Sequence, residues 1–154
     1  MQKLILMSAV VVLSVGLMNV ARVDRMNITV EPVDSIKAQT QMPKNVAAIF
    51  HRACRDCHTE STQWPWYSNI APFQWLITAD VYAARDHMNM SMWARYTEQE
   101  RTDRSIAICE MVAGNKMPLW YYKPLHYPSA WLSEADKKDV CDWAKAQAVG
   151  RGNR

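Results

Sequence analysis

With 154 residues the chain has room for one small domain and a targeting segment, and we expect no second domain. Its formal net charge is only +3, from 18 basic and 15 acidic residues, and no block of lysine or arginine interleaves with aromatic residues, so nucleic acid is not an expected partner. Ten methionines and seven tryptophans accompany two phenylalanines. Such side chains suit the wall of a large planar cofactor, although they more often simply fill a core.

The N-terminus has the composition of a secretory signal or an uncleaved signal anchor. Lys3 precedes an apolar run over residues 4–20, and charged residues end that run. As a helix these 17 residues would span about 26 Å, slightly less than the roughly 30 Å of a hydrocarbon core. Because the run continues past Gly16, where small residues would permit cleavage, we expect a retained anchor at residues 1–21. The rest is then expected in the periplasm or elsewhere outside the cytoplasm, anchored to the cytoplasmic membrane.

The next segment, residues 22–42, is predicted to be a linker. It is polar, contains Pro32 and shows no sustained periodicity. A flexible chain of this length would reach about 25 Å r.m.s. from a membrane. The folded domain is placed at residues 43–148 and a short tail at residues 149–154.

Four segments of the domain are predicted to be helices: 45–53, 72–88, 97–113 and 133–147. The first carries apolar residues at helical spacing and runs straight into a cysteine. The last two begin with capping signals, a hydroxyl residue followed three positions later by an acidic one: Thr97 and Glu100, Ser133 and Asp136.

Two long loops separate these helices. Residues 57–68 contain turn formers and several aromatic side chains, and residues 117–128 contain three prolines, which favour extended or turning backbone. No run alternates for long enough to predict a strand. We therefore predict an all-α domain of about four helices with two long loops, preceded by an N-terminal signal or anchor helix.

The clearest chemical motif is the run Cys54-Arg55-Asp56-Cys57-His58. It has the spacing of the c-type haem attachment motif, in which two thiols bond to the vinyl groups of one porphyrin and the adjacent imidazole binds the iron. The sequence therefore predicts one covalent haem c, held by Cys54 and Cys57, with His58 as an iron ligand.

Other uses of the two cysteines have less support. A thioredoxin-like redox pair requires a βαβ context, which the pattern does not contain. A zinc site could recruit Cys109 and Cys141, but 31 residues separate them and neither has knuckle spacing. A purely structural bond between Cys54 and Cys57 leaves His58 unexplained.

Met117 is the predicted sixth ligand to the iron. It lies 59 positions after His58, so its segment can approach from the opposite face, and Pro118 restricts the backbone beside it. The Met-Pro pair also resembles the ligand loop of small cytochromes c. The competing residues are four further methionines, two histidines and an open position: Met88, Met90, Met92, Met111, His87 and His126. His51 is expected at the surface.

Several of these motifs together resemble the bacterial haem-binding domain family, which consists of small exported proteins with one C-x-x-C-H motif. The matching pieces lie between about Pro43 and Gln147: residues 54–59, 64–72, 87–89 with Trp93, Met117-Pro118 and 132–134. The resemblance implies a predominantly helical, cytochrome-c-like domain. Cys109 and Cys141 are not part of the family pattern.

Two further groups of residues each allow two structural interpretations. Trp64, Trp66 and Tyr67 follow the haem motif and could cover one haem edge, or they could be ordinary packing of an aromatic loop. Cys109 and Cys141 lie on the third and fourth predicted helices. They could form a disulfide outside the cytoplasm, or they could be two buried thiols.

The predicted function is electron transfer by one haem, with a redox partner protein of unknown identity and with the membrane as a further partner if the N-terminal segment is retained. The alternative is a small-ligand sensor or a peroxide-handling enzyme whose sixth iron position is open. The pattern shows no obvious acid–base pair for such an enzyme, so a carrier is favoured over a catalyst.

Overall fold

The computed structural model describes residues 2–20 and 23–149, and helices are the only regular secondary structure in these ranges. In chain order the elements are α1 (Gln2–Val20), η1 (Pro32–Asp34), α2 (Ile36–Gln39), α3 (Lys44–Ala53), α4 (Arg55–His58), η2 (Trp66–Asn69), α5 (Phe73–His87), η3 (Met90–Arg95), α6 (Glu98–Ala113), η4 (Lys123–His126) and α7 (Glu134–Val149). No strand occurs in these two ranges. The predicted all-α fold is thereby confirmed, and its four helices are α3, α5, α6 and α7. The predicted tail beyond residue 149 lies outside the described residues.

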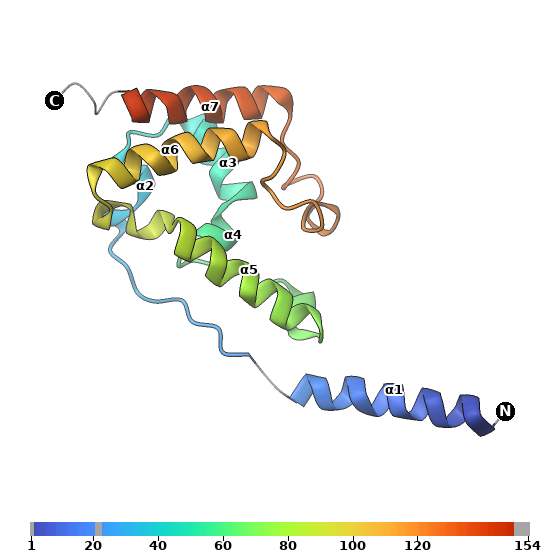
Figure 1. Ribbon diagram of the computed structural model, residues 1–154. Helices are drawn as coiled ribbons and strands as arrows, with labels where there is room; N and C mark the ends of the chain where they lie inside the picture. The colour runs from blue at the N-terminus through green and yellow to red at the C-terminus, as the bar shows by residue number, and fades with distance from the viewer. Residues whose placement is uncertain (1, 21–22, 150–154) are drawn as a thin grey trace.

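Helices α6 and α7 lie antiparallel and side by side at one end of the domain, with α3 packed against α7 (Figure 1). The core between them is apolar and includes Val46, Phe50, Trp93 and Val140, whose exposed fractions are 6% or less. A disulfide between Cys109 and Cys141 joins α6 to α7. Of the two open readings of these cysteines, the bonded one is the one observed.

The starts of the two C-terminal helices follow the capping residues predicted for them. At α6 the backbone N–H of Thr97 donates to the Glu100 carboxylate at 2.8 Å, and the N–H of Glu100 donates to the Thr97 hydroxyl at 3.3 Å. At α7 the N–H of Ser133 donates to Asp136 at 2.8 Å, and the N–H of Asp136 donates back to the hydroxyl at 3.1 Å. Each pair satisfies backbone donors that a helix start leaves without intrahelical partners.

Helix α5 lies apart from this layer and packs against α4 and η2 (Figure 1). A second, smaller apolar cluster joins these elements and consists of Tyr67, Ile77 and Val81, with Cys57 and Trp64 against it. The segment between α6 and α7 lies beside α3, where Arg52 donates to the carbonyl oxygens of Ser129 and Trp131. Residues of both apolar clusters line one cavity, and the candidate site lies there.

The described part of the expected linker, residues 23–42, packs on the domain. Ile36 and Thr40 are 5% and 4% exposed, and Ile36 belongs to the main apolar cluster. Ser35 begins the short helix α2, where its hydroxyl accepts from the N–H of Ala38 at 3.4 Å. This segment differs from a flexible spacer because α2 and η1 both contact η3, a relationship that no local pattern reveals.

The apolar run near the N-terminus forms α1, which extends away from the domain (Figure 1). Its described side chains are exposed. Near its end, the side-chain amide of Gln74 on α5 donates to the carbonyl oxygen of Met18 at 3.1 Å. Within residues 2–20 and 23–149, no helix combines the length and apolarity needed to cross a membrane.

Candidate functional site

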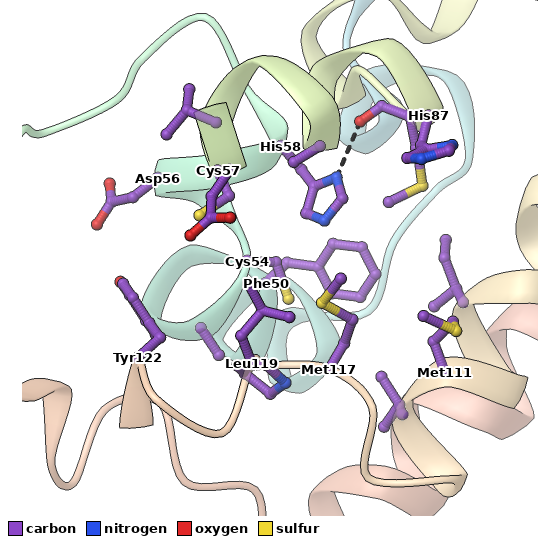
Figure 2. A pocket seen from close by; sticks show the side chains of 18 of the residues that line it. Phe50, Cys54, Asp56, Cys57, His58, His87, Met111, Met117, Leu119 and Tyr122 are labelled. Carbon is purple, nitrogen blue, oxygen red and sulfur yellow. Dashed lines mark hydrogen bonds between the residues drawn. The ribbon is translucent and has the colours of Figure 1, made fainter. Parts of the chain in front are cut away.

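A cavity of about 540 Å³ lies between α3, α4, α5, α6 and the segment that follows α6 (Figure 2). Its size falls within the roughly 300–1,000 Å³ of cofactor and small-ligand sites. Most of the side chains on its wall are apolar, among them Phe50, Ile77, Val81, Ala84, Ile108 and Leu119. The cavity therefore suits a large, mainly apolar ligand with few polar groups.

Cys54 and Cys57 both line this cavity and are free thiols. Helix α3 ends at Ala53, and Cys54 leaves the helical conformation at φ −125°, so the chain turns there into α4. Burial raises the pKa of the Cys54 thiol to about 12. Burial also raises the pKa of Cys57 to about 12, with a further contribution from Asp80 and Asp56. A thioredoxin-type pair needs a lowered thiol pKa, so this environment argues against that alternative.

The zinc alternative also lacks geometric support. Cys109 and Cys141 bond to each other and cannot join the first pair at a metal ion. In the part of the chain that the structure describes, no three His, Cys, Asp or Glu side chains converge in a way that could hold a metal. A haem iron requires only two axial ligands from the protein, because the porphyrin supplies the other four.

His58 is held with one ring nitrogen directed into the cavity. Its Nδ1 lies 3.0 Å from the carbonyl oxygen of Met88, and since a carbonyl only accepts, Nδ1 donates and Nε2 carries the lone pair. Figure 2 shows Nε2 pointing into the cavity. Burial lowers the pKa of His58, which favours the neutral imidazole. Metal-binding histidines typically donate their second ring N–H to a carbonyl or carboxylate in this way.

Met117 lies on the opposite wall of the cavity from His58 (Figure 2). Its backbone N–H and that of Lys116 donate to the carbonyl oxygen of Met111, at 3.1 and 2.9 Å, so the chain just after α6 stays tied to the helix end. Among the competing methionines, Met88 and Met111 also line the cavity. Met90 is buried in the main apolar cluster instead.

Both competing histidines, His87 and His126, also line the cavity. The Nε2 atom of His126 lies 2.6 Å from the Tyr67 hydroxyl, and its ring stacks on Tyr122 at 3.7 Å between centroids. His87 is an exposed residue on the cavity wall, at the end of α5. His51 is exposed on α3, where Nη1 of Arg55 lies 2.9 Å from its Nε2, in agreement with the expected surface position.

The aromatic residues of the loop after the motif do not line the cavity, so the structure favours their packing role over the expectation that they cover a haem edge. The described cavity wall includes Pro65 but not the rings of Trp64, Trp66 or Tyr67. Trp66 is 73% exposed, and Trp64 packs beneath the guanidinium of Arg25 at 4.9 Å. Tyr67 is buried behind the wall, where it shares an apolar cluster with the lining residues Ile77 and Val81 and its hydroxyl contacts His126. Tyr67 and Trp64 pack against Ile77 and Val81 of α5 instead of lining the cavity. Their closeness to Cys57 in the sequence does not reveal this packing.

Two charged features of the wall were missed from the sequence. The hydroxyl of Tyr121 donates to both carboxylate oxygens of Asp80 at 3.1 Å. Burial raises the pKa of Asp80, and it raises the pKa of Tyr121 to about 12 with Asp80 contributing. Arg104 lines the cavity beside His87, whose carbonyl oxygen accepts from its Nε at 3.1 Å. Asp80 shares the spacing of the apolar residues Ile77 and Ala84 on α5, which is a signal that could have revealed it.

A family model described as a haem-binding domain matches residues 11–146, which is most of the chain. No similar curated protein and no similar solved structure was found.

Proposed function

Since the chain belongs to the haem-binding domain family and haem is its ligand, we propose that one haem c is bonded covalently to Cys54 and Cys57. His58 and Met117, which lie on opposite walls of the cavity, would be the two protein ligands of the haem iron. The single observation that supports this most strongly is the hydrogen bond from His58 to the Met88 carbonyl, which leaves Nε2 free to bind a metal inside a cavity that both thiols line.

The wall of the cavity fits the chemistry of such a group. A haem iron supplies one-electron chemistry, and its axial ligands and the polarity of its pocket set the reduction potential. Apolar side chains such as Ile49 and Val112 would exclude water from the group, and a thioether of Met117 bound to the iron would raise the potential relative to a second histidine. Arg104 and His87 are basic residues on the wall that suit the carboxylates of a porphyrin.

The proposed role is electron transfer to or from a partner protein outside the cytoplasm. A six-coordinate iron suits this task because no position is open to a substrate. The N-terminal composition, with Lys3 before an apolar run, supports export, and haem c and persistent disulfides such as that of Cys109 and Cys141 belong to extracytoplasmic compartments. The redox partner is a protein that accepts or donates one electron.

A second function is favoured by one observation, the Asp80–Tyr121 pair on the cavity wall. A carboxyl and a phenol that are hydrogen-bonded to each other could act on a small ligand or a peroxide if Met117 were not bound to the iron. Carbon monoxide distinguishes the two functions. The reduced spectrum should change only slowly for the electron carrier, and at once for a sensor or enzyme with an open position.

The covalent attachment is tested by extraction with acidified acetone. The wild-type protein should retain its colour in the protein pellet, because thioether bonds survive the solvent. The single variants Cys54→Ala and Cys57→Ala should each keep one thioether bond, and the double variant should release any haem it has bound. Release of haem from the wild type would contradict covalent attachment.

A further inference from the structure

A buried ion pair lies close in the chain to both partners of the His58–Met88 hydrogen bond. Nη1 of Arg85 on α5 lies 2.9 Å from Oε2 of Glu60, and the two side chains are only 8% and 6% exposed. Glu60 follows His58 by two positions, and Arg85 precedes Met88 by three. The pair therefore links the two backbone segments that the hydrogen bond between His58 and Met88 also joins.

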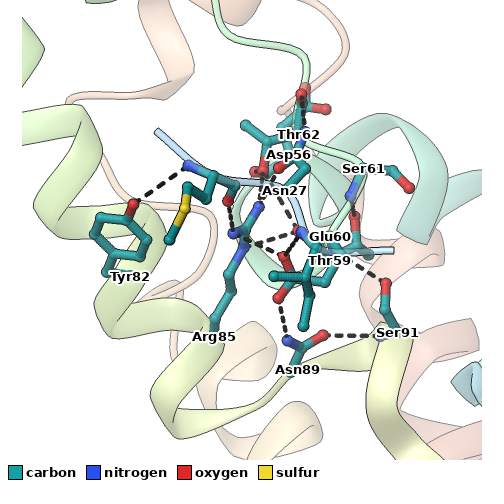
Figure 3. Close-up of polar contacts among 12 residues, drawn as sticks. Asn27, Asp56, Thr59, Glu60, Ser61, Thr62, Tyr82, Arg85, Asn89 and Ser91 are labelled. Atoms are coloured by element: carbon teal, nitrogen blue, oxygen red, sulfur yellow. Dashed lines mark hydrogen bonds and ion pairs between the residues drawn. The ribbon is translucent and has the colours of Figure 1, made fainter. Parts of the chain in front are cut away.

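The guanidinium of Arg85 has partners around its whole edge (Figure 3). Its Nε donates to the carbonyl oxygen of Thr59 at 2.9 Å, and Nη2 donates to the hydroxyl of Thr62 at 2.8 Å. Two further bonds reach the segment before the domain: Nη1 donates to the carbonyl oxygen of Met26 at 2.7 Å, and Nη2 to Oδ1 of Asn27 at 2.6 Å. A planar group with five donors is suited to hold several acceptors at once.

The carboxylate of Glu60 connects this network to Asn89, the residue after Met88, and to the N-terminal segment. Its Oε1 accepts from the side-chain amide of Asn89 at 2.7 Å, and its Oε2 accepts from the backbone N–H of Ile28 at 3.2 Å. The backbone N–H of Glu60 donates to the hydroxyl of Ser91 at 3.0 Å. Asn89 directly follows Met88, and its own N–H donates to the Tyr96 hydroxyl at 2.7 Å, so the carbonyl that His58 uses is held from its C-terminal side.

We propose that this network, which we call the Arg85–Glu60 clamp, positions the imidazole of His58, and that residues 26–28 are a working part of it. The clamp comprises Arg85, Glu60, Asn89 and the segment 26–28. It holds Thr59 and Glu60 after the ligand and Asn89 after the acceptor carbonyl, so it restrains both ends of the His58–Met88 hydrogen bond. The inference rests on the proposed function, because the ring that is positioned is the proposed iron ligand.

The clamp explains why a segment outside the four main helices is ordered against the domain. An arginine with so many acceptors and a buried carboxylate with two backbone or amide donors form a network in which nearly every polar atom is satisfied, and such networks fix one arrangement. Groups that orient a metal-binding histidine typically change metal affinity or activity by about 10–100-fold when they are removed. The residues 26–28 would thereby act on the iron without touching it.

The test uses the reduced holoprotein, in which low-spin iron is diamagnetic and the Nδ1 proton of His58 is visible by NMR. Removing one partner of a buried pair leaves an unpaired charge, so the main variant is the double substitution Glu60→Gln with Arg85→Met. The exchange of this proton with solvent should be about tenfold faster or more in the double variant. The reduction potential should rise, because a weaker hydrogen bond makes the imidazole a poorer donor to ferric iron.

Two single variants make the result specific. Asn27→Ala removes one exposed residue of the clamp, so it should fold normally and accelerate proton exchange in the same direction by a smaller factor. Arg25→Met is the matched control, because Arg25 also fastens the N-terminal segment, through Asn69, the carbonyl oxygen of Ser68 and the ring of Trp64, and none of these three is next to His58 or Met88 in the chain. This control should leave proton exchange and potential unchanged.

A double variant that unfolds more easily but keeps the wild-type proton exchange rate and potential would overturn the clamp, since the network would then be merely structural. A wild type in which the His58 ring shows none of the large shifts of an iron ligand would instead overturn the proposed ligand role and this inference with it. The first outcome appears only in the variants and the second in the wild type, so the two failures are distinct.

Discussion

Met117 faces His58 across the cavity, although 59 positions separate the two residues in the chain. The two side chains come from different elements, one from α4 and the other from the segment that follows α6. An arrangement with one ligand on each side is what a planar group between them requires. Met111, another thioether on the wall, lies on α6 itself and provides a matched comparison.

Substitution of Met117 tests the second iron ligand. The oxidised wild-type protein should show the weak near-infrared absorption band of sulfur bonded to ferric iron, and Met117→Ala should abolish it. Reduced Met117→Ala should also bind carbon monoxide rapidly, because the position becomes open. Met111→Ala removes a thioether from the same wall and should retain the band. A band that survives in Met117→Ala, or that is absent from the wild type, would remove Met117 from the iron.

A substitution at Ile36 tests whether the segment before α3 belongs to the folded domain. Ile36→Ala should lower the free energy of unfolding by about 2–4 kcal/mol, because the side chain is 5% exposed within the main apolar cluster. Val33→Ala is the control, since Val33 lies in the same segment and is 63% exposed, and it should change stability by less than about 0.5 kcal/mol. Equal effects in urea unfolding would show that the segment does not pack as described.

Removal of the disulfide should destabilise the protein without releasing haem. The bond closes a loop with a sequence separation of 32, which corresponds to about 3–4 kcal/mol in the loop-entropy treatment. The double variant Cys109→Ala with Cys141→Ala should lose that free energy of unfolding, and treatment of the wild type with a thiol reductant should give the same value. Unchanged stability in the double variant would mean that the bond constrains little in the unfolded chain.

The start of α7 should show a specific pH dependence. Burial alone would raise the pKa of Asp136, but hydrogen bonds from Ser133 and the guanidinium of Arg52, 2.8 Å away, lower it below its usual value. A carboxyl with a depressed pKa stabilises the fold above its unfolded pKa of about 3.9, and this contribution is lost as the pH falls through the lower folded value. Asp136→Ala should therefore cost about 1 kcal/mol at neutral pH, and less below about pH 4.

The control for this prediction is Asp142→Ala. Asp142 lies on the same helix and pairs with Lys138, but the two side chains are 60% and 74% exposed. Exposed pairs of this kind contribute little, so the variant should stay within about 0.5 kcal/mol of the wild type at every pH. If both variants showed the same pH dependence in urea unfolding, the proposed role of the helix start would be wrong.

The helices were predictable because their signals are local. Apolar spacing in residues 45–53 and the capping residues Thr97 and Ser133 predict α3, α6 and α7 with ends close to those observed. The position of Cys54 at the end of α3 was predictable too, because the apolar spacing of residues 45–53 runs straight into it. Each of these signals depends on residues no more than a few positions apart.

Features that depend on long-range contacts were not predictable. Arg85 and Glu60 are 25 positions apart in the chain, and they pair because α5 packs on the loop after α4. The 3₁₀ helix Met90–Arg95 carries the buried Trp93, which lies in the same apolar cluster as Ile36 of α2. Nothing in the residue pattern of either segment indicates this contact. The side on which the rings of Trp64 and Tyr67 face likewise depends on α5.

The pyridine haemochrome spectrum of the protein after extraction with acidified acetone tests the central claim most directly. The account predicts one haem per chain retained in the protein fraction, with the absorption maximum of a haem whose two vinyl groups are saturated by Cys54 and Cys57. A spectrum with intact vinyl groups, haem recovered in the solvent, or a ratio other than one haem per chain would contradict it.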